Sequence, residues 1–358
     1  MMSSILDRPD LLTRLDRLQM SELLGSFSIQ VEEALQIGED FKTPSFHRKP
    51  EKILFVGMGG SAIGGDVIRS LLSDKATHPI SVSRHYELPP SVDSKTLCIF
   101  SSYSGNTEET LSAFRQAMKR HLPSVIITSG GELWRLGERF SIPRIQIPSG
   151  LPPRAALGYS VFPLLKLFAN LKLWRWDERA VRETVSLLEK LREKFSPAVP
   201  FRKNPAKRLA HDFFNRFVVI YAGVDLLDTA ALRFRNQIEE NAKAMASHHL
   251  IPEMNHNEIL GWQFPKEVLK KCACVFLRDS EDHKRIQLRF KITKGVIEKR
   301  GVSVTEIYSQ GKSRLARLFS SIYLGDWISF YLALLYGIEP TPVVVIEHLK
   351  KELAKVRS

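Results

Sequence analysis

Cysteine and long uncharged apolar runs are both scarce in this chain of 358 residues. Three cysteines cannot form a closed set of disulfides, and Cys98, Cys272 and Cys274 each lie in an apolar run typical of a buried strand, so we expect reduced core residues. The longest apolar stretch, residues 155–174, contains two lysines and falls short of the roughly 18 uncharged residues that a membrane span needs. The sequence therefore predicts neither a disulfide scaffold nor a transmembrane helix.

The first ten residues contain acids and a proline, and lack the basic patch and apolar core that mark a secretory signal. We therefore expect a cytoplasmic protein. A hydrophobic fraction of 44% and a charged fraction of 25% lie near globular averages, which excludes collagen-like, coiled-coil and wholly disordered chains. The length fits two domains of ordinary size, at roughly 150 residues each.

Basic residues outnumber acidic ones by 52 to 39, and the resulting charge of +13 raises nucleic acid as a partner. The strongest basic run, residues 189–208, also contains three prolines and no nucleic-acid motif with interleaved aromatic residues. The run fits the end of a helix followed by a proline-containing linker, where a charge run is usually a solvated face. A positive field also steers a phosphate substrate toward its site. We expect no nucleic-acid partner.

Apolar runs alternate with helical patterns along the first half of the chain. Residues 8–37 favour one or two N-terminal helices, and residues 53–57 form a continuous apolar run that ends in glycine, as in a parallel strand buried on both faces. Alternation at this spacing predicts an α/β fold with a doubly wound parallel sheet. The remaining strands are expected at residues 80–83, 96–101, 124–128 and 144–147, and the helices at 61–72, 108–119, 132–139 and 158–171.

The second half repeats this plan. Residues 217–223, 274–280 and 303–311 resemble the strands at 53–57, 98–104 and 124–131, and an apolar helix closes each unit, at 158–171 and at 327–336. Duplication of one α/β unit would explain the length. The expected division is an N-terminal helical segment (1–50), a first domain (51–195), a linker at 196–208 and a second domain (209–358).

The segment Ser102-Tyr-Ser-Gly-Asn-Thr107 follows an apolar strand and precedes a helix. Three hydroxyls and several backbone N–H groups then gather at a helix N-terminus, which is typical of a phosphate-binding loop. The alternative is a plain cap with Thr107 or Asn106 as N-cap residue. One hydroxyl suffices for a cap, so the extra serines and the glycine favour phosphate binding.

Two other patterns have weaker functional interpretations. Gly57-Met-Gly-Gly-Ser-Ala62 can be fitted to a dinucleotide fingerprint, but the second strand ends in Arg84 rather than in the acid that would bind a ribose, which leaves an NADP enzyme as a minor alternative. His248, His249, His256, Glu253 and Glu258 could be read as a metal cluster, yet their spacing matches no zinc motif. By composition alone, residues 233–241 are an ordinary solvated helix.

Taken together, several motifs resemble the bifunctional phosphoglucose/phosphomannose isomerase family, whose members have two sugar isomerase (SIS) domains with flavodoxin-like sheets. The likeness runs in order from about residue 52 to residue 353. The motifs are Gly57-Met-Gly-Gly-Ser61, Ser102–Thr107, Pro153-Arg154-Ala-Ala-Leu-Gly-Tyr159, Asn236-Gln-Ile-Glu-Glu240-Asn-Ala-Lys243, Pro252-Glu-Met-Asn-His256-Asn-Glu258 and the tail from Glu339 to Lys350.

The resemblance implies a homodimer that interconverts glucose 6-phosphate and mannose 6-phosphate with fructose 6-phosphate, in glycolysis and gluconeogenesis, without a metal or other cofactor. It implies that Arg154 steadies the enediolate, that Glu240 is the base, and that His256, reaching in from the partner subunit, opens the sugar ring with Lys350. Glu239 and Lys351 stay open as alternatives for Glu240 and Lys350. Substrate contacts are implied for Gly60, Ser61, Ser102, Ser104 and Thr107, and a role in tolerance of mannose for Thr341.

The implied chemistry needs one carboxylate that moves a proton between C2 and C1, and one fixed cation that stabilises the cis-enediolate. A remote phosphate site supplies binding energy that positions the reacting end. A non-catalytic phosphosugar-binding SIS protein is the alternative, because the same fold serves as a sensor. The sequence leaves the ratio of glucose to mannose activity undetermined.

Overall fold

The computed structural model describes residues 5–46, 48–353 and 355–356, and contains two parallel sheets. The first has the order β2-β1-β3-β4-β5 and the second the order β7-β6-β8-β9, with every neighbouring pair parallel. The strands are β1 (Lys52–Val56), β2 (Ile80–Ser83), β3 (Thr96–Ser101), β4 (Ser124–Thr128), β5 (Arg144–Gln146), β6 (Phe217–Gly223), β7 (Ala246–Ile251), β8 (Cys272–Arg278) and β9 (Val304–Tyr308).

The duplication expected from the sequence is confirmed by the strand order. Strands β6, β7, β8 and β9 take the places of β1, β2, β3 and β4, and the described part of the second sheet has no strand in the place of β5. The central strands are fully buried apolar runs, as a parallel sheet covered on both faces requires. The free thiols of Cys98, Cys272 and Cys274 lie in these strands, as predicted.

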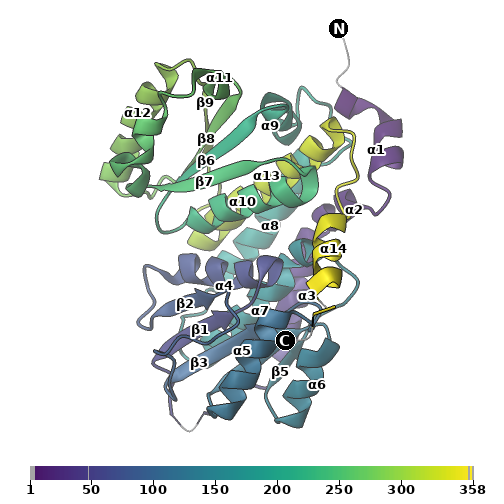
Figure 1. Cartoon of the computed structure of the whole chain (residues 1–358), viewed down its shortest axis with the longest axis vertical. Coiled ribbons are helices and arrows are strands. Elements are labelled where there is room, and N and C mark those ends of the chain that lie inside the picture. The colour runs from purple at the N-terminus through teal and green to yellow at the C-terminus, as the bar shows by residue number, and fades with distance from the viewer. Residues whose placement is uncertain (1–4, 47, 354, 357–358) are drawn as a thin grey trace.

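Helices cover both faces of each sheet (Figure 1). Helix α10 packs against α13 and also contacts α4, so the helices that follow the two corresponding first strands meet between the sheets. The helices are α1 (Pro9–Leu15), α2 (Met20–Gly25), α3 (Phe27–Asp40), α4 (Gly59–Leu72), α5 (Glu108–Lys119), α6 (Gly131–Arg139), α7 (Leu157–Asn170), α8 (Glu178–Phe195), α9 (Pro205–Phe213), α10 (Asp228–Ala242), α11 (Lys266–Leu269), α12 (Lys284–Glu298), α13 (Arg314–Leu335) and α14 (Val344–Leu353), with short 3-10 turns at Ile5–Asp7, Pro153–Ala155, Glu253–His256 and Glu258–Gly261.

Helix α13 is the one described helix long and apolar enough to cross a membrane, but 94% of its apolar window is buried inside the molecule. It is therefore the central core helix of the fold. The sequence predicted only residues 327–336 as a closing apolar helix. The structure extends it back to Arg314, and the polar side chains of Arg317 and Asp326 along it are buried and paired.

The N-terminal helices bind both halves of the chain. Helix α3 packs on α7, and the Tyr323 hydroxyl of α13 donates to the Leu24 carbonyl at 2.9 Å. The Lys207 ammonium lies 2.9 Å from the Asp7 carboxylate and is fully buried. The expectation that the basic run 189–208 forms a solvated face is therefore wrong at Lys207, because the acid of the N-terminal turn pairs with it.

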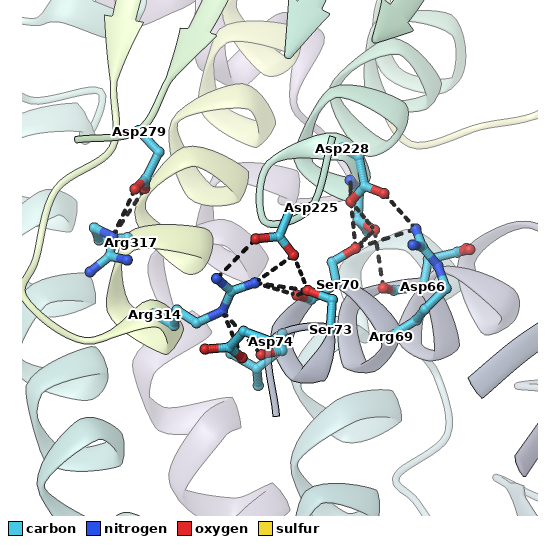
Figure 2. Close-up of polar contacts among 12 residues, drawn as sticks. Asp66, Arg69, Ser70, Ser73, Asp74, Asp225, Asp228, Asp279, Arg314 and Arg317 are labelled. Carbon is cyan, nitrogen blue, oxygen red and sulfur yellow. Dashed lines mark hydrogen bonds and ion pairs between the residues drawn. The ribbon is translucent and has the colours of Figure 1, made fainter. Parts of the chain in front are cut away.

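Polar side chains join the domains where α4 ends (Figure 2). The Arg314 guanidinium donates to the carbonyls of Ser70 and Leu71 and pairs with Asp225 at 3.0 Å. The Ser70 hydroxyl donates to Asp228 at 2.5 Å. These contacts fix α4 against the start of both α10 and α13.

Candidate active site

The loop between β3 and α5 carries the predicted phosphate-binding hydroxyls. Thr107 is the N-cap residue of α5, but its side chain makes no capping bond; its Oγ1 lies 2.9 Å from the Ser102 Oγ instead. The Ser61 Oγ, at the start of α4, accepts a hydrogen bond of 2.9 Å from the Tyr103 backbone N–H. The capping alternative therefore fails for the Thr107 side chain, and hydroxyls from two loops gather at the carboxyl end of the first sheet.

Glycines allow these loops to approach one another. A Cβ on Gly105, whose φ is +69°, would lie 1.8 Å from the Gly130 carbonyl oxygen, so no other residue fits there without movement of the loop. A Cβ on Gly57 would lie 2.7 Å from the Ser101 carbonyl oxygen. The glycines of the first loop thus serve contacts within the protein. The guanidinium of Arg84, the group considered for an NADP phosphate, is bound to the Asp66 carboxylate.

Gly60 brings the start of α4 against the 3-10 turn that carries Arg154. A Cβ there would lie 2.9 Å from the Pro153 carbonyl carbon and 3.0 Å from the Arg154 backbone nitrogen. The absence of a side chain therefore sets the distance between the hydroxyl-lined loops and the predicted enediolate-binding arginine.

Arg154 is buried, with 3% of its surface exposed, and its donors are directed by the second domain. Its Nε donates to the Asn241 Oδ1 at 2.6 Å, and its Nη2 donates to the carbonyls of Pro340 and Thr341 at 3.0 and 2.8 Å. Its Nη1 lies 3.6 Å from the Glu240 Oε2. Burial lowers the pKa of Arg154, and the charge of Glu240 opposes that shift.

A buried polar network between α10 and α13 holds Arg154 and the end of α10 in place. Arg233 donates to the Arg154 carbonyl at 2.8 Å and forms a bidentate pair with Asp326, at 3.0 and 2.8 Å. Gln237 donates to the same carboxylate at 2.9 Å, and Asn241 donates to Ser329 at 2.9 Å. The helix at 233–241 is therefore not the ordinary solvated helix that composition suggested. The spacing of 233, 237 and 241 by four residues places three polar side chains on one face, a signal that could have revealed it.

The structure distinguishes the two candidate bases. The Glu240 side chain is 27% exposed and is directed to Arg154, whereas the Glu239 side chain is 43% exposed and lies 3.7 Å from Arg235 on the same helix. Burial also raises the pKa of Glu239. Of the two carboxylates, only Glu240 is brought to the arginine.

Sequence reasoning gave no role to Lys243, which follows α10 in a left-handed conformation. Its ammonium donates to the carbonyls of Glu240 and Pro340, at 2.8 and 2.6 Å, and so ties the end of α10 to the segment that carries Thr341. Burial, with the nearby charge of Arg154, lowers the pKa of Lys243 to about 8. The Thr341 Oγ1 is buried and has no hydrogen-bond partner in the described residues.

His256 and Lys350 are not joined to this constellation within one chain. His256 is exposed on the 3-10 turn Glu253–His256, and Lys350 is exposed on α14. Across the described residues, neither side chain forms a hydrogen bond or an ion pair. The same holds for the Lys351 side chain, so the choice between the two lysines stays open.

Of the neighbouring histidines, His249 has a structural partner, whereas the buried Nδ1 of His248 has no hydrogen-bond partner in the described residues. His249 Nδ1 lies 3.0 Å from the Glu258 carboxylate, which also accepts from the Tyr221 hydroxyl at 2.6 Å. Burial lowers the pKa of His248 to about 4. In the part of the chain that the structure describes, no group of three or more His, Cys, Asp or Glu residues could hold a metal ion.

Comparison with known proteins agrees with these features. Residues 202–353 match the model of the bacterial phospho-glucose isomerase C-terminal SIS domain, and residues 46–132 match the SIS domain. A bifunctional phosphoglucose/phosphomannose isomerase of Caldicellulosiruptor bescii is 46% identical over 94% of this chain and 100% of its own length. One of Aquifex aeolicus is 37% identical over 85% of this chain and 90% of its own length.

Solved structures share the fold. A hypothetical protein from Thermus thermophilus superposes with a TM-score of 0.73, at 18% identity, over 98% of this chain and 93% of its own. A glucose-6-phosphate isomerase like protein from the same organism gives 0.63, at 19% identity, over 95% and 98%. The full-length likeness to the curated relatives is the stronger finding: the chain belongs to the bifunctional phosphoglucose/phosphomannose isomerase family.

Proposed function

We propose that this protein is an aldose-ketose isomerase that interconverts glucose 6-phosphate and mannose 6-phosphate with fructose 6-phosphate through a cis-enediol. The observation that carries the proposal is the 3.6 Å approach of Glu240 to the buried Arg154, beside the hydroxyl-lined loops at the start of α4 and α5. The proposed phosphate and sugar contacts are Gly60, Ser61, Ser102, Ser104 and Thr107.

Glu240 takes the proton from C2 of the open-chain aldose and returns it to C1, while the hydroxyl proton passes from O2 to O1, so that the carbonyl group moves from C1 to C2. The charge that develops on the enediolate oxygens meets Arg154, whose guanidinium is already oriented by Asn241 and by two backbone carbonyls. A donor fixed before the reaction needs no reorganisation when charge develops. The phosphate, held by the hydroxyls and N–H groups at the two helix starts, positions the reacting carbons.

Ring opening needs a proton donor at the ring oxygen and an acceptor for the proton of the anomeric hydroxyl. We assign these roles to His256 and Lys350, and place His256 in the site of the partner subunit of a homodimer. Exposed apolar side chains support the dimer: Val345 of α14 is 81% exposed, and Phe264, which follows His256, is 72% exposed. A second copy would cover such surfaces.

C2 of the enediol is planar, so its configuration in the substrate is lost. Rotation about the C2–C3 bond before the proton returns gives glucose 6-phosphate or mannose 6-phosphate from one intermediate. We propose that the hydroxyl of Thr341, buried and unpaired in the described residues, binds a sugar hydroxyl during this rotation. The reaction needs no metal in this scheme, and the expected location is the cytoplasm.

The decisive experiment follows turnover of glucose 6-phosphate and, separately, of mannose 6-phosphate to fructose 6-phosphate with a chelator present. Deuterium from solvent should appear at C2 of both aldose phosphates. Turnover of both substrates supports the proposal, and turnover that the chelator removes contradicts its metal-independent form. Binding of fructose 6-phosphate without turnover or exchange would favour a non-catalytic phosphosugar-binding protein.

A further inference from the structure

A second cleft, of about 1740 Å³, lies between the domains and away from the proposed active site. Its walls come from the end of α4, the connection from α7 to α8, and the loops that follow β8 and β9. Arg314 and Asp74, which form part of the wall, appear at the centre of Figure 2. None of the residues proposed for catalysis or for sugar-phosphate binding lines this cleft.

The internal duplication explains why a cleft forms here. In the active site, loops at the carboxyl end of the first sheet meet the C-terminal part of α10, the helix that follows β6. In the second cleft, loops at the carboxyl end of the second sheet meet the C-terminal end of α4, the helix that follows β1. The cleft is thus the counterpart of the active site, at the sheet edge where α/β proteins bind ligands.

Unpaired cations dominate its lining. Five exposed basic side chains form no hydrogen bond and no ion pair to any described residue, whereas only one lining carboxylate, that of Glu281, has no partner of its own. The other acids are engaged: Asp74 lies 3.5 Å from Arg314, and Glu178 pairs with Arg182 at 2.9 Å. The Asp177 carboxylate caps α8. The five free cations are Lys75, Lys172, Arg175, Arg179 and Lys312.

Two indoles lie beside these cations. Trp174 and Trp176 line the cleft with ring centroids 5.8 Å apart and an interplanar angle of 77°, and both are partly exposed. The Lys166 ammonium lies over the Trp176 ring at 4.5 Å, and the Trp176 Nε1 donates to Glu178 at 3.0 Å, so that ring is held in place. The Trp174 side chain packs partly against the main core and makes no hydrogen bond with the described residues, and its partly exposed ring lines the cleft.

The backbone N–H groups at the start of α13 are not free to bind an anion in the cleft. The backbone N–H groups of Lys312 and Ser313 already donate to the Glu183 carboxylate, at 2.5 and 2.9 Å. An anion in the cleft must therefore be bound by side chains. The charge of five unpaired cations exceeds that of a single phosphate, and a chain of two or more phosphates matches it better.

We propose that this cleft binds a nucleotide with at least two phosphates, with its base against Trp174 and its phosphates between the lysines of the two domains. Basic side chains bind phosphate oxygens, and an indole stacks on a base by the same contact that single-strand binding proteins use. Lys172 of the first domain and Lys312 of the second then contact one ligand. The site is independent of the isomerase site and of the function proposed for it.

The test is a titration of the full chain with ADP by calorimetry and by tryptophan fluorescence, at an ionic strength of about 150 mM. Saturating fructose 6-phosphate is present to occupy the active site. We expect saturable binding of one ADP per chain. The charge reversals Lys172→Glu and Lys312→Glu should each weaken it at least about tenfold. The matched control is Lys119→Glu, an exposed lysine on α5 outside the cleft, which should leave binding unchanged.

The fluorescence arm tests the aromatic contact. ADP should quench the intrinsic emission, and Trp174→Phe should remove most of the quenching while the protein stays folded and active. Absence of saturable ADP binding, or an equal loss of binding in Lys119→Glu, overturns the site. Pyrophosphate binding as tight as ADP binding overturns the contact with the base. Isomerase activity is measured on the same samples. Active protein without ADP binding contradicts the nucleotide site alone, and ADP binding by protein without activity contradicts the proposed function alone.

Discussion

Arg154 and Glu240 come from different copies of the duplicated unit, and the Nη1 of the first lies 3.6 Å from the Oε2 of the second. The arginine is placed by the second domain: Asn241 of α10 binds its side chain, and Arg233 of the same helix binds its carbonyl. The reacting groups are therefore fixed across the domain boundary. Neither domain alone holds both the proposed base and the proposed cation.

Replacement of Glu240 by Gln should lower kcat by about 10³-fold and leave the fold intact, because the proposed general base is lost while the side chain keeps its size. Steady-state assays on glucose 6-phosphate and mannose 6-phosphate measure the effect. Glu239→Gln is the matched control on the same helix. A larger loss of activity in Glu239→Gln than in Glu240→Gln would reassign the base.

Asp326→Asn should lower the free energy of unfolding by about 3 kcal/mol, because it leaves the buried Arg233 charge without its bidentate partner. Urea unfolding measures the change. The double variant Arg233→Met with Asp326→Leu removes both charges. Its loss of unfolding free energy should be smaller than the sum of the losses in the single variants Arg233→Met and Asp326→Leu. Additive losses would show that the pair is not coupled.

Gly105→Ala should weaken binding of fructose 6-phosphate about tenfold or more, because a Cβ would lie 1.8 Å from the Gly130 oxygen and would displace the loop that holds Ser102 and Thr107. Gly295→Ala, on α12, is the control, since no atom lies within 4 Å of its new methyl group. Calorimetric titration of both variants gives the comparison. Equal affinities in the two variants would contradict a role of this loop in phosphate binding.

The half-buried imidazole of His248 should make the protein less stable in acid. Its pKa is about 4 in the folded chain and about 6.5 in the unfolded chain, so the unfolded state binds more protons between these values and stability falls as pH decreases through that window. The side chain is not fully buried, so we expect a contribution of about 1 to 2 kcal/mol. His248→Gln should flatten the pH dependence of unfolding between pH 6.5 and 4. An unchanged slope would contradict the assignment.

Much of the fold could be predicted because buried parallel strands have continuous apolar sequences. All five strands of the first sheet were predicted within one residue of their observed bounds. The edge strand β7 was missed because three of its residues, Ser247, His248 and His249, are polar and only half of the strand faces the core. The extent of α13 was missed because its buried polar residues break the apolar pattern.

The candidate site could be predicted only in part from the sequence. Motifs identified Arg154 and Glu240, and the structure brings them together. Composition could not reveal that Arg233, Gln237 and Asn241 are buried, because their burial depends on the partners Asp326 and Ser329 some 90 residues away. The placement of His256 and Lys350 depends on a second copy of the chain, so it stays a prediction.

The contacts of the N-terminal helices also constrain the order in which a nascent chain can fold. Residues 5–40 are synthesised before two of their partners, since Asp7 pairs with Lys207 and the Leu24 carbonyl accepts from Tyr323. These partners are synthesised about 200 and 300 residues later. The contacts with Lys207 and Tyr323 can therefore form only after translation has reached α9 and α13, whereas α3 can pack on α7 earlier.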